Sequence, residues 1–366
     1  MNKEIITNKQ GISIVVLFII GSAIVLSPGG EAKQNVWLAI LLAVLMTIPI
    51  IFIYARLLSI FPGKDLFDIL QEVFGKILGK IISLLFVWYA FHLGALVIRN
   101  FSEFIQIVSF PETPQLIVAA FLGVVCIWII KAGIEILGRW AGFVLPFLLI
   151  TIICLILLSL TEAEFNNIRP VLYDGVTPVL KSAFSIFSFP FAEVVVFMMV
   201  FCSIKSKFST YKVYITGLLI GGLILLSASI RNVLVLGIGT ASILYFPSLS
   251  AVSLINIGNF LQRIEIIVSV VFLLAGIVKI GVCLYAVSNG VAKIFNFDSY
   301  RPLVAPIGFL MMNLSGFIYR STMEMFEWAE KIYQFYAMPF QIILPLIIFI
   351  VAEIKSRVGN HGKENC

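Results

Sequence analysis

The chain of 366 residues is 61% hydrophobic and only 12% charged, with a mean hydropathy of +1.09. Soluble domains are roughly 45–50% apolar and about 25% charged, so this composition excludes a soluble globular protein and predicts one that crosses a membrane repeatedly. The net charge of +6 is spread over the ends of apolar runs, and we expect no nucleic-acid site from it. No cysteine pair has CxxC spacing and the only histidines, His92 and His361, are far apart, so we expect neither a metal nor a cofactor.

Ten apolar runs are long enough for helices that cross a bilayer. They cover roughly residues 11–28, 35–58, 80–106, 115–131, 133–160, 178–204, 211–236, 262–292, 302–319 and 334–354. The predicted fold is therefore an all-α polytopic membrane protein with ten transmembrane helices, forming a single transmembrane domain over 1–366 with a short tail at 355–366. We expect no cleavable signal peptide, because the first run has no small-residue cleavage site and nine more follow it.

Two further stretches, 59–80 and 323–335, are amphipathic and suit helices that lie in the membrane interface. The apolar side chains of the first stretch fall mostly on one face: Phe67, Ile69, Leu70, Phe74 and Leu78.

The distribution of Lys and Arg predicts the orientation. Sixteen of the 25 basic residues fall on the side of the two termini and eight on the other, with Lys279 inside a span. The bias predicts that both termini are cytoplasmic, as an even number of spans requires.

Two runs contain residues that weaken a helix at mid-membrane depth. Gly21–Ala23 interrupts the first run, and the sixth contains Ser188, Pro190 and Glu193 close together. Proline removes a backbone donor and clashes with the preceding turn, and irregular backbone persists inside a membrane only where protein buries it or where it lines a wet cavity. Close helix packing is the alternative explanation for the small residues of the first run.

The two weakened runs open corresponding halves of the chain, about 11–160 and 178–354, and they enter the membrane from opposite sides. This arrangement predicts an inverted five-plus-five repeat with broken helices 1 and 6 around a central binding site.

Short motifs along the whole chain resemble one known family. They are GISIVVLFIIGSAIVLSP at 11–28, NIRPV at 167–171, FPSL at 246–249, Arg263 and Glu265 in LQRIE, and Asn289-Gly290. Their order, with similar span order and loop lengths, resembles the spore germination permease family, the B-subunit class of nutrient germinant receptors. That family belongs to the amino acid–polyamine–organocation transporter superfamily.

The resemblance implies a subunit that senses a nutrient, typically an amino acid and sometimes a sugar, in the inner membrane of a bacterial spore. It also implies partners, the A and C subunits of a germinant receptor, to which ligand binding is signalled. An amino acid permease, with or without proton coupling, is the alternative. We do not expect an enzyme, because the chain has no HExxH or GxSxG motif and no paired carboxylates at mid-membrane depth.

The resemblance further implies that ligand binds at the broken parts of spans 1 and 6, with spans 3 and 8 closing the pocket. The candidate substrate-binding residues are Gly21, Ser22, Ala23, Tyr89, His92, Leu93, Phe187, Ser188, Phe191, Glu193, Lys279 and Cys283. Exposed amides at a broken helix would hold a carboxylate, and free carbonyls or Glu193 would hold an ammonium group. Phe187, Phe189 and Phe191 would suit a compact, partly apolar side chain.

Lys279 is placed midway along span 8, where an ammonium group is costly and needs a partner or a cavity. Three interpretations stay open: it binds a ligand carboxylate, it occupies the place of a sodium ion, or it forms a structural pair with Glu193. His92 is either a hydrogen-bonded packing residue or a proton relay.

Pro190, Arg99 and Glu103 are assigned structural or gating roles. Arg99 and Glu103 are four residues apart, so they can pair along one helix face. Arg263 and Glu265 are expected to make separate contacts, and Arg169 is a candidate anchor for another subunit.

Overall fold

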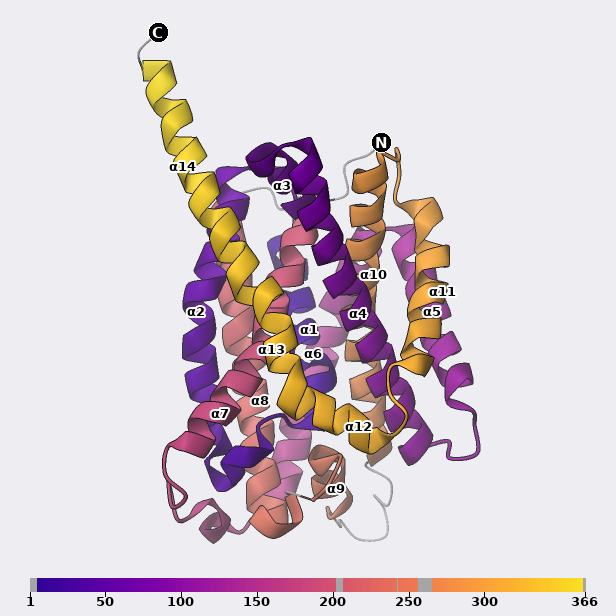
Figure 1. Cartoon of the computed structure of the whole chain (residues 1–366). Helices are drawn as coiled ribbons and strands as arrows, with labels where there is room; N and C mark the ends of the chain where they lie inside the picture. The colour runs from indigo at the N-terminus through magenta and orange to yellow at the C-terminus, as the bar shows by residue number, and fades with distance from the viewer. Residues whose placement is uncertain (1–4, 202–206, 242, 256–264, 365–366) are drawn as a thin grey trace.

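The computed structural model describes residues 5–201, 207–241, 243–255 and 265–364. These residues form helices and connecting turns, with no strand among them, and the helices pack side by side as a bundle (Figure 1). Eight of the described helical segments are long and apolar enough to cross a membrane. The predicted all-α membrane fold is therefore confirmed in its class.

The first half of the chain contains these elements: α1 (Asn8–Leu26), η1 (Gly30–Asn35), α2 (Val36–Ile60), α3 (Leu66–Phe74), α4 (Lys76–Val108), α5 (Gln115–Ala132), α6 (Ile134–Ser159), η2 (Leu160–Glu162) and η3 (Phe165–Ile168). The second half contains these: α7 (Thr177–Ile186), η4 (Phe187–Phe191), η5 (Ala192–Met199), α8 (Lys207–Ala241), α9 (Pro247–Ser253), α10 (Glu265–Phe295), α11 (Arg301–Phe317), α12 (Thr322–Glu327), η8 (Trp328–Ile332), α13 (Tyr333–Met338), η9 (Pro339–Ile343) and α14 (Leu344–Glu364).

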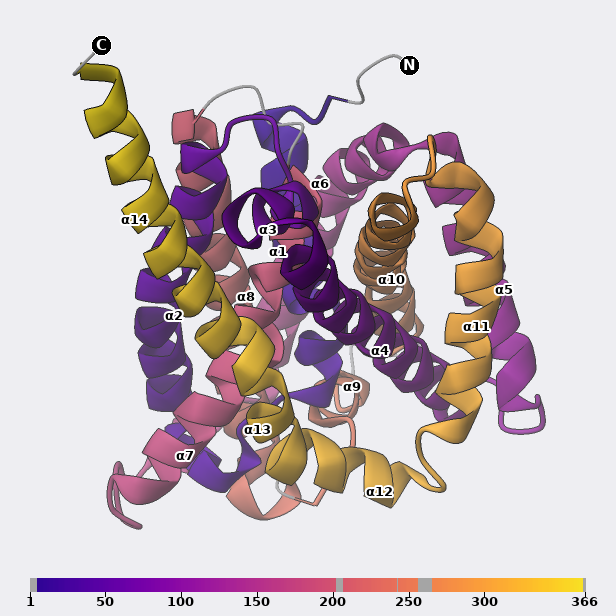
Figure 2. The same ribbon diagram turned by 45° about the horizontal axis from the view of Figure 1, so that its top comes forward.

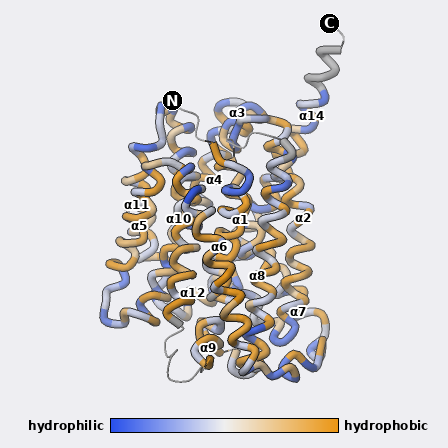
Figure 3. The backbone as a smooth tube through the Cα atoms, turned by 180° about the vertical axis from the view of Figure 1, so that it is seen from behind, coloured by the Kyte–Doolittle hydropathy of each residue, from blue (hydrophilic) through white to orange (hydrophobic). Residues whose placement is uncertain are grey.

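The helix positions follow the predicted runs closely. Helices α1, α5 and α11 have 19, 18 and 17 residues. Helices α1 and α11 fall in predicted runs but are not among the eight candidate membrane spans, so the predicted number of ten spans stays a prediction. Helix α14 continues beyond residue 354, through the predicted tail, to Glu364. Hydrophobic residues colour the middle of the bundle in Figure 3, and hydrophilic ones gather towards its two ends.

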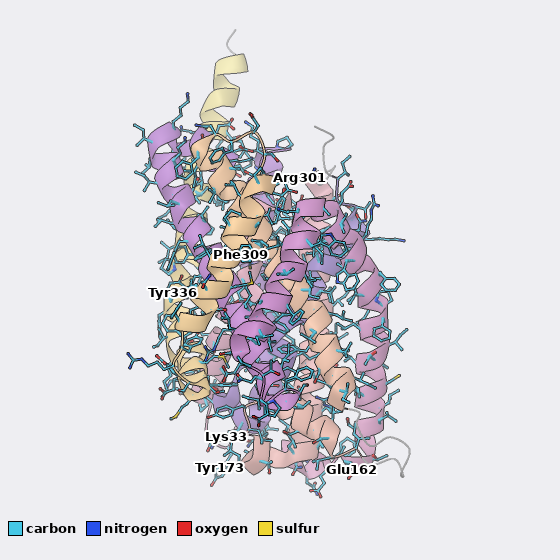
Figure 4. The ribbon with its side chains drawn as sticks, turned by 90° about the vertical axis from the view of Figure 1, so that its right-hand side faces the viewer. Lys33, Glu162, Tyr173, Arg301, Phe309 and Tyr336 are labelled. Atoms are coloured by element: carbon cyan, nitrogen blue, oxygen red, sulfur yellow. The ribbon has the colours of Figure 1, made fainter. Side chains whose placement is uncertain are left out.

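The start of α1 and the end of α14 lie at the same end of the bundle, which we call the terminal end (Figure 1). The opposite end, here the distal end, carries α9. Figure 4 shows the same polarity in single side chains, with Lys33, Glu162 and Tyr173 near the distal end and Arg301 towards the terminal end.

Helix α1 runs through the centre of the bundle, where it packs against α6, α8 and α10 (Figure 2). All side chains of Ile14–Ile20 are fully buried in protein. Helix α1 therefore has no side that faces lipid. A helix that is hydrophobic on every face can be buried in this way, because each face packs against a neighbouring helix.

The predicted break of the first span at Gly21–Ala23 is wrong. Helix α1 is unbroken through these residues, and the amide of Ser27 still donates to the carbonyl of Ala23 at 3.0 Å. The chain leaves the helix only at Ser27 (φ 47°), followed by Gly29 (φ 95°). The amides at Gly21–Ala23 are therefore not free to bind a ligand.

The predicted break of the sixth span is confirmed. Helix α7 ends at Ile186, and η4 is a wide π-helical turn in which Phe189 adopts extended dihedrals (φ −132°, ψ 113°) before Pro190. The chain then continues as the tighter 3₁₀ helix η5. Proline lacks the amide that an α-helix would need at this depth, so the backbone is left irregular.

The amphipathic stretch 59–80 is only partly as predicted. Its helix α3 is short, and Phe67, Ile69 and Leu70 are buried against the rest of the protein. Leu78 does not belong to this face, because a new helix begins at Lys76 and exposes it. The second stretch, 323–335, divides into α12, η8 and the start of α13, and it leads directly into the last span.

Candidate functional site

A buried ion pair joins α10 to the irregular part of the sixth span. Lys279 Nζ lies 2.6 Å from Glu193 Oε2, and both side chains are at most 1% exposed. Lys279 also donates to Ser22 Oγ on α1 at 3.3 Å. Burying two charges is costly unless each is paired and hydrogen-bonded, so the pair holds α1, η5 and α10 in one arrangement.

The side chain of Lys279 fits because α1 has no side chain at Gly21. A Cβ atom added there would lie 3.1 Å from Lys279 Cδ. The ammonium group lies over the rings of Phe18 and Phe189, with Nζ 5.0 and 4.9 Å from their centroids. Such cation–π contacts add to the stabilisation of a desolvated ammonium group.

The second oxygen of Glu193 continues the network towards the last span. Tyr333 donates its hydroxyl hydrogen to Glu193 Oε1 at 2.6 Å, and the hydroxyl oxygens of Tyr333 and Tyr89 are 3.3 Å apart. Gln341 Nε2 donates to Tyr89 Oη at 3.0 Å. Polar contacts thereby join six helical elements: α1, α4, η5, α10, α13 and η9.

The broken span supplies a further polar group to this network. Gln341 Nε2 donates to the carbonyl of Ser188 at 2.8 Å, and Ser188 Oγ donates to Gln341 Oε1 at 3.1 Å. The carbonyl of Gln341 accepts from the hydroxyl of Tyr54 on α2. The irregular backbone thus finds hydrogen bonds within the protein, as its depth requires.

We call these residues the central cluster: Ser22, Tyr89, Ser188, Glu193, Lys279, Tyr333 and Gln341. Every member is buried. The cluster contains one cation, one anion, four hydroxyl groups and one amide, and a continuous chain of hydrogen bonds links them. Its chemistry matches small ligands that carry both charges or several hydroxyl groups.

The structure brings five of the predicted substrate-binding residues together in this cluster: Ser22, Tyr89, Ser188, Glu193 and Lys279. Gly21 lies directly against Lys279, although its backbone is not open. Pro190 follows Phe189, the ring of which covers the ammonium group.

The other predicted residues make different contacts. His92 packs among aromatic rings, stacked on Trp88 with centroids 5.8 Å apart. Its Nδ1 atom has no hydrogen-bond partner among the described residues. Phe187 stacks on Phe184, and Phe191 lies 3.8 Å from the position of a Cβ added at Gly222 on α8.

The remaining predicted residues are apolar packing positions. Leu93 and Ala23 are buried. Cys283 lies one turn beyond Lys279 and packs against α4. A Cβ atom added at Gly94 of α4 would lie 3.1 Å from the Cβ atom of Cys283. The thiol of Cys283 is nevertheless close enough to Lys279 and Glu193 to interact with them electrostatically.

Tyr333 and Gln341 were not identified from the sequence. Gln341 carried a usable signal, because a lone amide within an apolar run is costly unless it is buried in protein and paired. Tyr333 falls in the stretch that we assigned to the membrane interface, where tyrosine is common. The bends at η8 and η9 that carry the last span past the cluster had no sequence motif that we recognised.

The predicted pairing of Arg99 with Glu103 is confirmed, with Arg99 Nη2 3.0 Å from Glu103 Oε2. Glu103 also accepts hydrogen bonds from Gln115 at 2.8 Å and from Thr322. The carboxylate therefore joins α4 to α5 and α12, away from the central cluster, which agrees with a structural role. Of the other predicted contacts, Arg263 and the side chain of Glu265 lie outside the described residues.

Comparisons with known proteins agree on one family. A model of the Spore_permease family, described as spore germination protein, matches residues 5–324. Spore germination protein KB of Bacillus subtilis (strain 168) is 29% identical over 370 residues, covering 100% of this chain and 99% of that protein. The putative spore germination protein YfkT of the same organism is 26% identical over 334 residues, which is 91% of each chain.

Two solved structures share the arrangement of helices, and one of them is named as a transporter. Mhp1, a nucleobase-cation-symport-1 family transporter in a closed conformation with bromovinylhydantoin bound, gives a TM-score of 0.65 at 14% identity, covering 95% of this chain and 78% of that one. MhsT in complex with L-phenylalanine gives 0.65 at 15% identity, covering 93% and 87%. At these identities the likeness shows a shared fold and nothing finer.

Proposed function

Since the chain belongs to the spore germination protein family, we propose that it is the nutrient-sensing subunit of a spore germinant receptor. It binds a small nutrient at the central cluster and signals to the A and C subunits. Its location is the inner membrane of the spore, with both termini in the cytoplasm. Relatives named as spore germination proteins along the whole chain support this proposal.

The single observation that supports an amino acid as the ligand is the buried ion pair of Lys279 and Glu193. An amino acid offers a carboxylate for Lys279 and an ammonium group for Glu193. It can therefore take the place of the internal pair without leaving either protein charge unpaired. An uncompensated buried charge would cost about 3–5 kcal/mol, so a ligand with only one charge is strongly disfavoured. A sugar would instead use the hydroxyl and amide groups of Tyr89, Tyr333 and Gln341.

Signalling follows from the two arrangements that such an exchange defines. In one, Lys279 and Glu193 pair and hold α10 against η5. In the other, the ligand separates them, and the segment from Phe187 to Met199, which is π-helical and 3₁₀-helical rather than α-helical, is the part that moves. A ligand shifts the equilibrium between the two arrangements only to the extent that it binds the second with higher affinity than the first.

We propose that the helices divide into an inverted five-plus-five repeat, α1–α6 and α7–α14. Termini at one end of the bundle and the confirmed break of the sixth span support this division. An amino acid permease, with or without proton coupling, is the second candidate, because one structural neighbour is named as a transporter and another is in complex with L-phenylalanine.

The test uses the purified full chain in liposomes with a panel of radiolabelled amino acids and sugars, following retained label over time. The Lys279→Met variant is compared with Lys331→Met, which removes an exposed lysine from a pair with Glu327. A plateau near one ligand per protein that is lost only in Lys279→Met supports a sensor. Label that rises towards the internal volume identifies a permease. Equal binding in both variants contradicts the central cluster as the site.

A further inference from the structure

A cavity lies between the central cluster and the distal end of the bundle. It holds about 490 Å³, which is within the range of small-molecule sites, about 300–1,000 Å³. Three parts of the chain form its walls: η1 with the glycine before it, α7, and the stretch of η8 and α13. Figures 1 and 2 both show α7 next to α13. The cavity is therefore large enough for a ligand of the size of an amino acid.

The cavity opens to water. Three charged residues of its lining, Glu31, Lys181 and Glu330, are exposed, and exposed charges in a membrane protein face water rather than hydrocarbon. Lys33, two residues after Glu31 on η1, lies near the distal end in Figure 4. A water-soluble ligand can therefore enter from the distal side, which the proposed orientation places outside the cytoplasm.

Charges of both signs line the cavity. Glu31 of η1 and Glu330 of η8 are close enough for their carboxylates to interact electrostatically, and Glu330 Oε1 would lie 3.6 Å from a Cβ atom added at Gly30. Lys181 of α7 supplies an ammonium group. Because the two carboxylates repel each other, a ligand ammonium group between them would relieve the repulsion.

An apolar wall stands beside these charges. Phe184 of α7 and Phe335 of α13 both line the cavity, and their ring centroids are 6.3 Å apart. Gln334 lines it as well, and its Oε1 atom is buried without a hydrogen-bond partner among the described residues. The lining thus combines charges of both signs, a free acceptor and aromatic rings, which is the chemistry of an amino acid with an apolar side chain.

We propose that this cavity is a second binding site, at which a zwitterionic amino acid with an apolar side chain binds before it reaches the central cluster. This inference rests on the proposed nutrient-binding function. The ammonium group of the ligand lies between Glu31 and Glu330, and its carboxylate pairs with Lys181. Its side chain contacts Phe184 and Phe335. Because these charges are in contact with water, the cavity binds more weakly than the buried cluster.

The walls of the cavity continue into the central cluster. Gln334 follows Tyr333, the hydroxyl of which donates to Glu193 at 2.6 Å. Phe184 stacks on Phe187, the first residue of the irregular segment η4, with centroids 6.2 Å apart. A ligand in the cavity therefore lies against the two segments that carry most of the cluster.

The test measures how a ligand shields the cavity in the purified full chain. Ser185→Cys places a thiol in the lining, and its modification by N-ethylmaleimide is followed by mass spectrometry of the peptide that contains it. The probe is L-phenylalanine. N-acetyl-L-phenylalanine, which lacks the ammonium group, and L-phenylalaninamide, which lacks the carboxylate, are the ligand controls. The reagent is neutral, so changes of charge in the protein do not steer it.

Four further variants are made in the Ser185→Cys chain. Glu330→Gln and Lys181→Met remove the groups that hold the two ends of the ligand. Lys279→Met disables the central cluster. Glu162→Gln is the matched control, because Glu162 is an exposed carboxylate near the distal end that does not line the cavity.

L-Phenylalanine is expected to slow the modification more than either control ligand does. The concentration that gives half protection should rise about fivefold in Glu330→Gln and in Lys181→Met, and it should be unchanged in Glu162→Gln and Lys279→Met. The unchanged value in Lys279→Met separates this site from the central cluster, so either site can fail its own test while the other stands.

Three results would overturn the proposal: no slowing by L-phenylalanine, equal protection by N-acetyl-L-phenylalanine, or equal half-protection concentrations in Glu330→Gln and Glu162→Gln. Loss of protection in Lys279→Met would also overturn it, because the protection would then come from the central cluster. Should Lys279→Met fail to fold, the comparison of Glu330→Gln with Glu162→Gln still decides the question.

Discussion

The ammonium group of Lys279 on α10 and the carboxylate of Glu193 on η5 form an ion pair 2.6 Å long that is buried at the middle of the protein. Of the three interpretations of Lys279, its pairing with Glu193 is therefore confirmed. The pair does not exclude a role in ligand binding, because a ligand with both charges can exchange with it. That role stays a prediction. The first set of variants tests how much the ion pair contributes to the stability of the protein.

Removing one partner of the pair should destabilise the protein more than removing both. Lys279→Met leaves a buried carboxylate, Glu193→Gln leaves a buried ammonium group, and each should cost about 3–5 kcal/mol, whereas the double variant should recover much of the loss. Thermal unfolding in detergent measures the shifts. The exposed pair Lys331 and Glu327 is the matched control, for which all three variants should differ by less than about 1 kcal/mol. Additive losses at the buried pair would contradict the coupling.

Gly21→Leu should abolish the ligand response while the protein still inserts in the membrane. The new side chain would start 3.1 Å from Lys279 Cδ and would push the lysine away from Glu193 and Ser22. Gly142→Leu on α6 is the control, since nothing lies within 4 Å of its added Cβ. Nutrient-induced germination of spores that carry each variant, with membrane content checked by immunoblot, is the measurement. A normal response in Gly21→Leu would show that the contact is unimportant.

Tyr333→Phe should lower the stability by about 1.5–3 kcal/mol, because Glu193 Oε1 loses the charged hydrogen bond that now satisfies it. Tyr214→Phe provides the comparison, since the hydroxyl of Tyr214 is equally buried but has no hydrogen-bond partner among the described residues. Melting temperatures of the two variants, measured in one detergent, give the difference. A similar effect of both changes would mean that the bond from Tyr333 contributes little.

The sequence was sufficient to predict the helical class, the position of the helices and one of the two helix breaks. The break at Pro190 could be predicted because proline cannot donate the hydrogen bond that an α-helix requires. Gly21 and Ser22 both have a backbone amide that can donate in an α-helix. Inside a membrane, an unbroken helix satisfies the hydrogen bonds of their backbone groups within the segment itself. Gly21 leaves space for the side chain of Lys279, which lies on another helix. The residues around Gly21 in the sequence therefore could not predict this contact.

The same reasoning explains which site residues were predicted and which were missed. Glu193 and Lys279 stand out because a charge within an apolar run needs a partner. Tyr333 and Gln341 reach the cluster where the last span passes through the wide turns η8 and η9. Pro339 opens η9, and the ring of Phe340 in this turn stacks on Tyr89 of α4 with centroids 4.9 Å apart. His92 was included because it is close to Tyr89 in the sequence, and its ring reaches Tyr89 only indirectly, through Tyr336 and Phe340.

The terminal end of α10 is fastened to α3, and loosening this contact should free α3 selectively. Asp65 caps α3 by accepting from the amide of Asp68 at 3.1 Å, and its other oxygen lies 2.7 Å from Lys293 Nζ and 2.8 Å from Asn289 Nδ2. Asp65→Ala removes the cap and the bond to α10 together. The loss of the cap alone should cost about 0.5–2 kcal/mol.

Hydrogen–deuterium exchange of the amides in Leu66–Phe74 measures this effect, and the exchange should accelerate there while the centre of α1 stays protected. Asp174→Ala is the control, because Asp174 makes an exposed ion pair with Lys33 on the distal end. Since α10 also carries Lys279, a change at Asp65 that altered ligand response as well as exchange would connect the terminal end to the central cluster. Unchanged exchange in Leu66–Phe74 would show that the buried apolar face of α3, and not its polar cap, holds the helix in place.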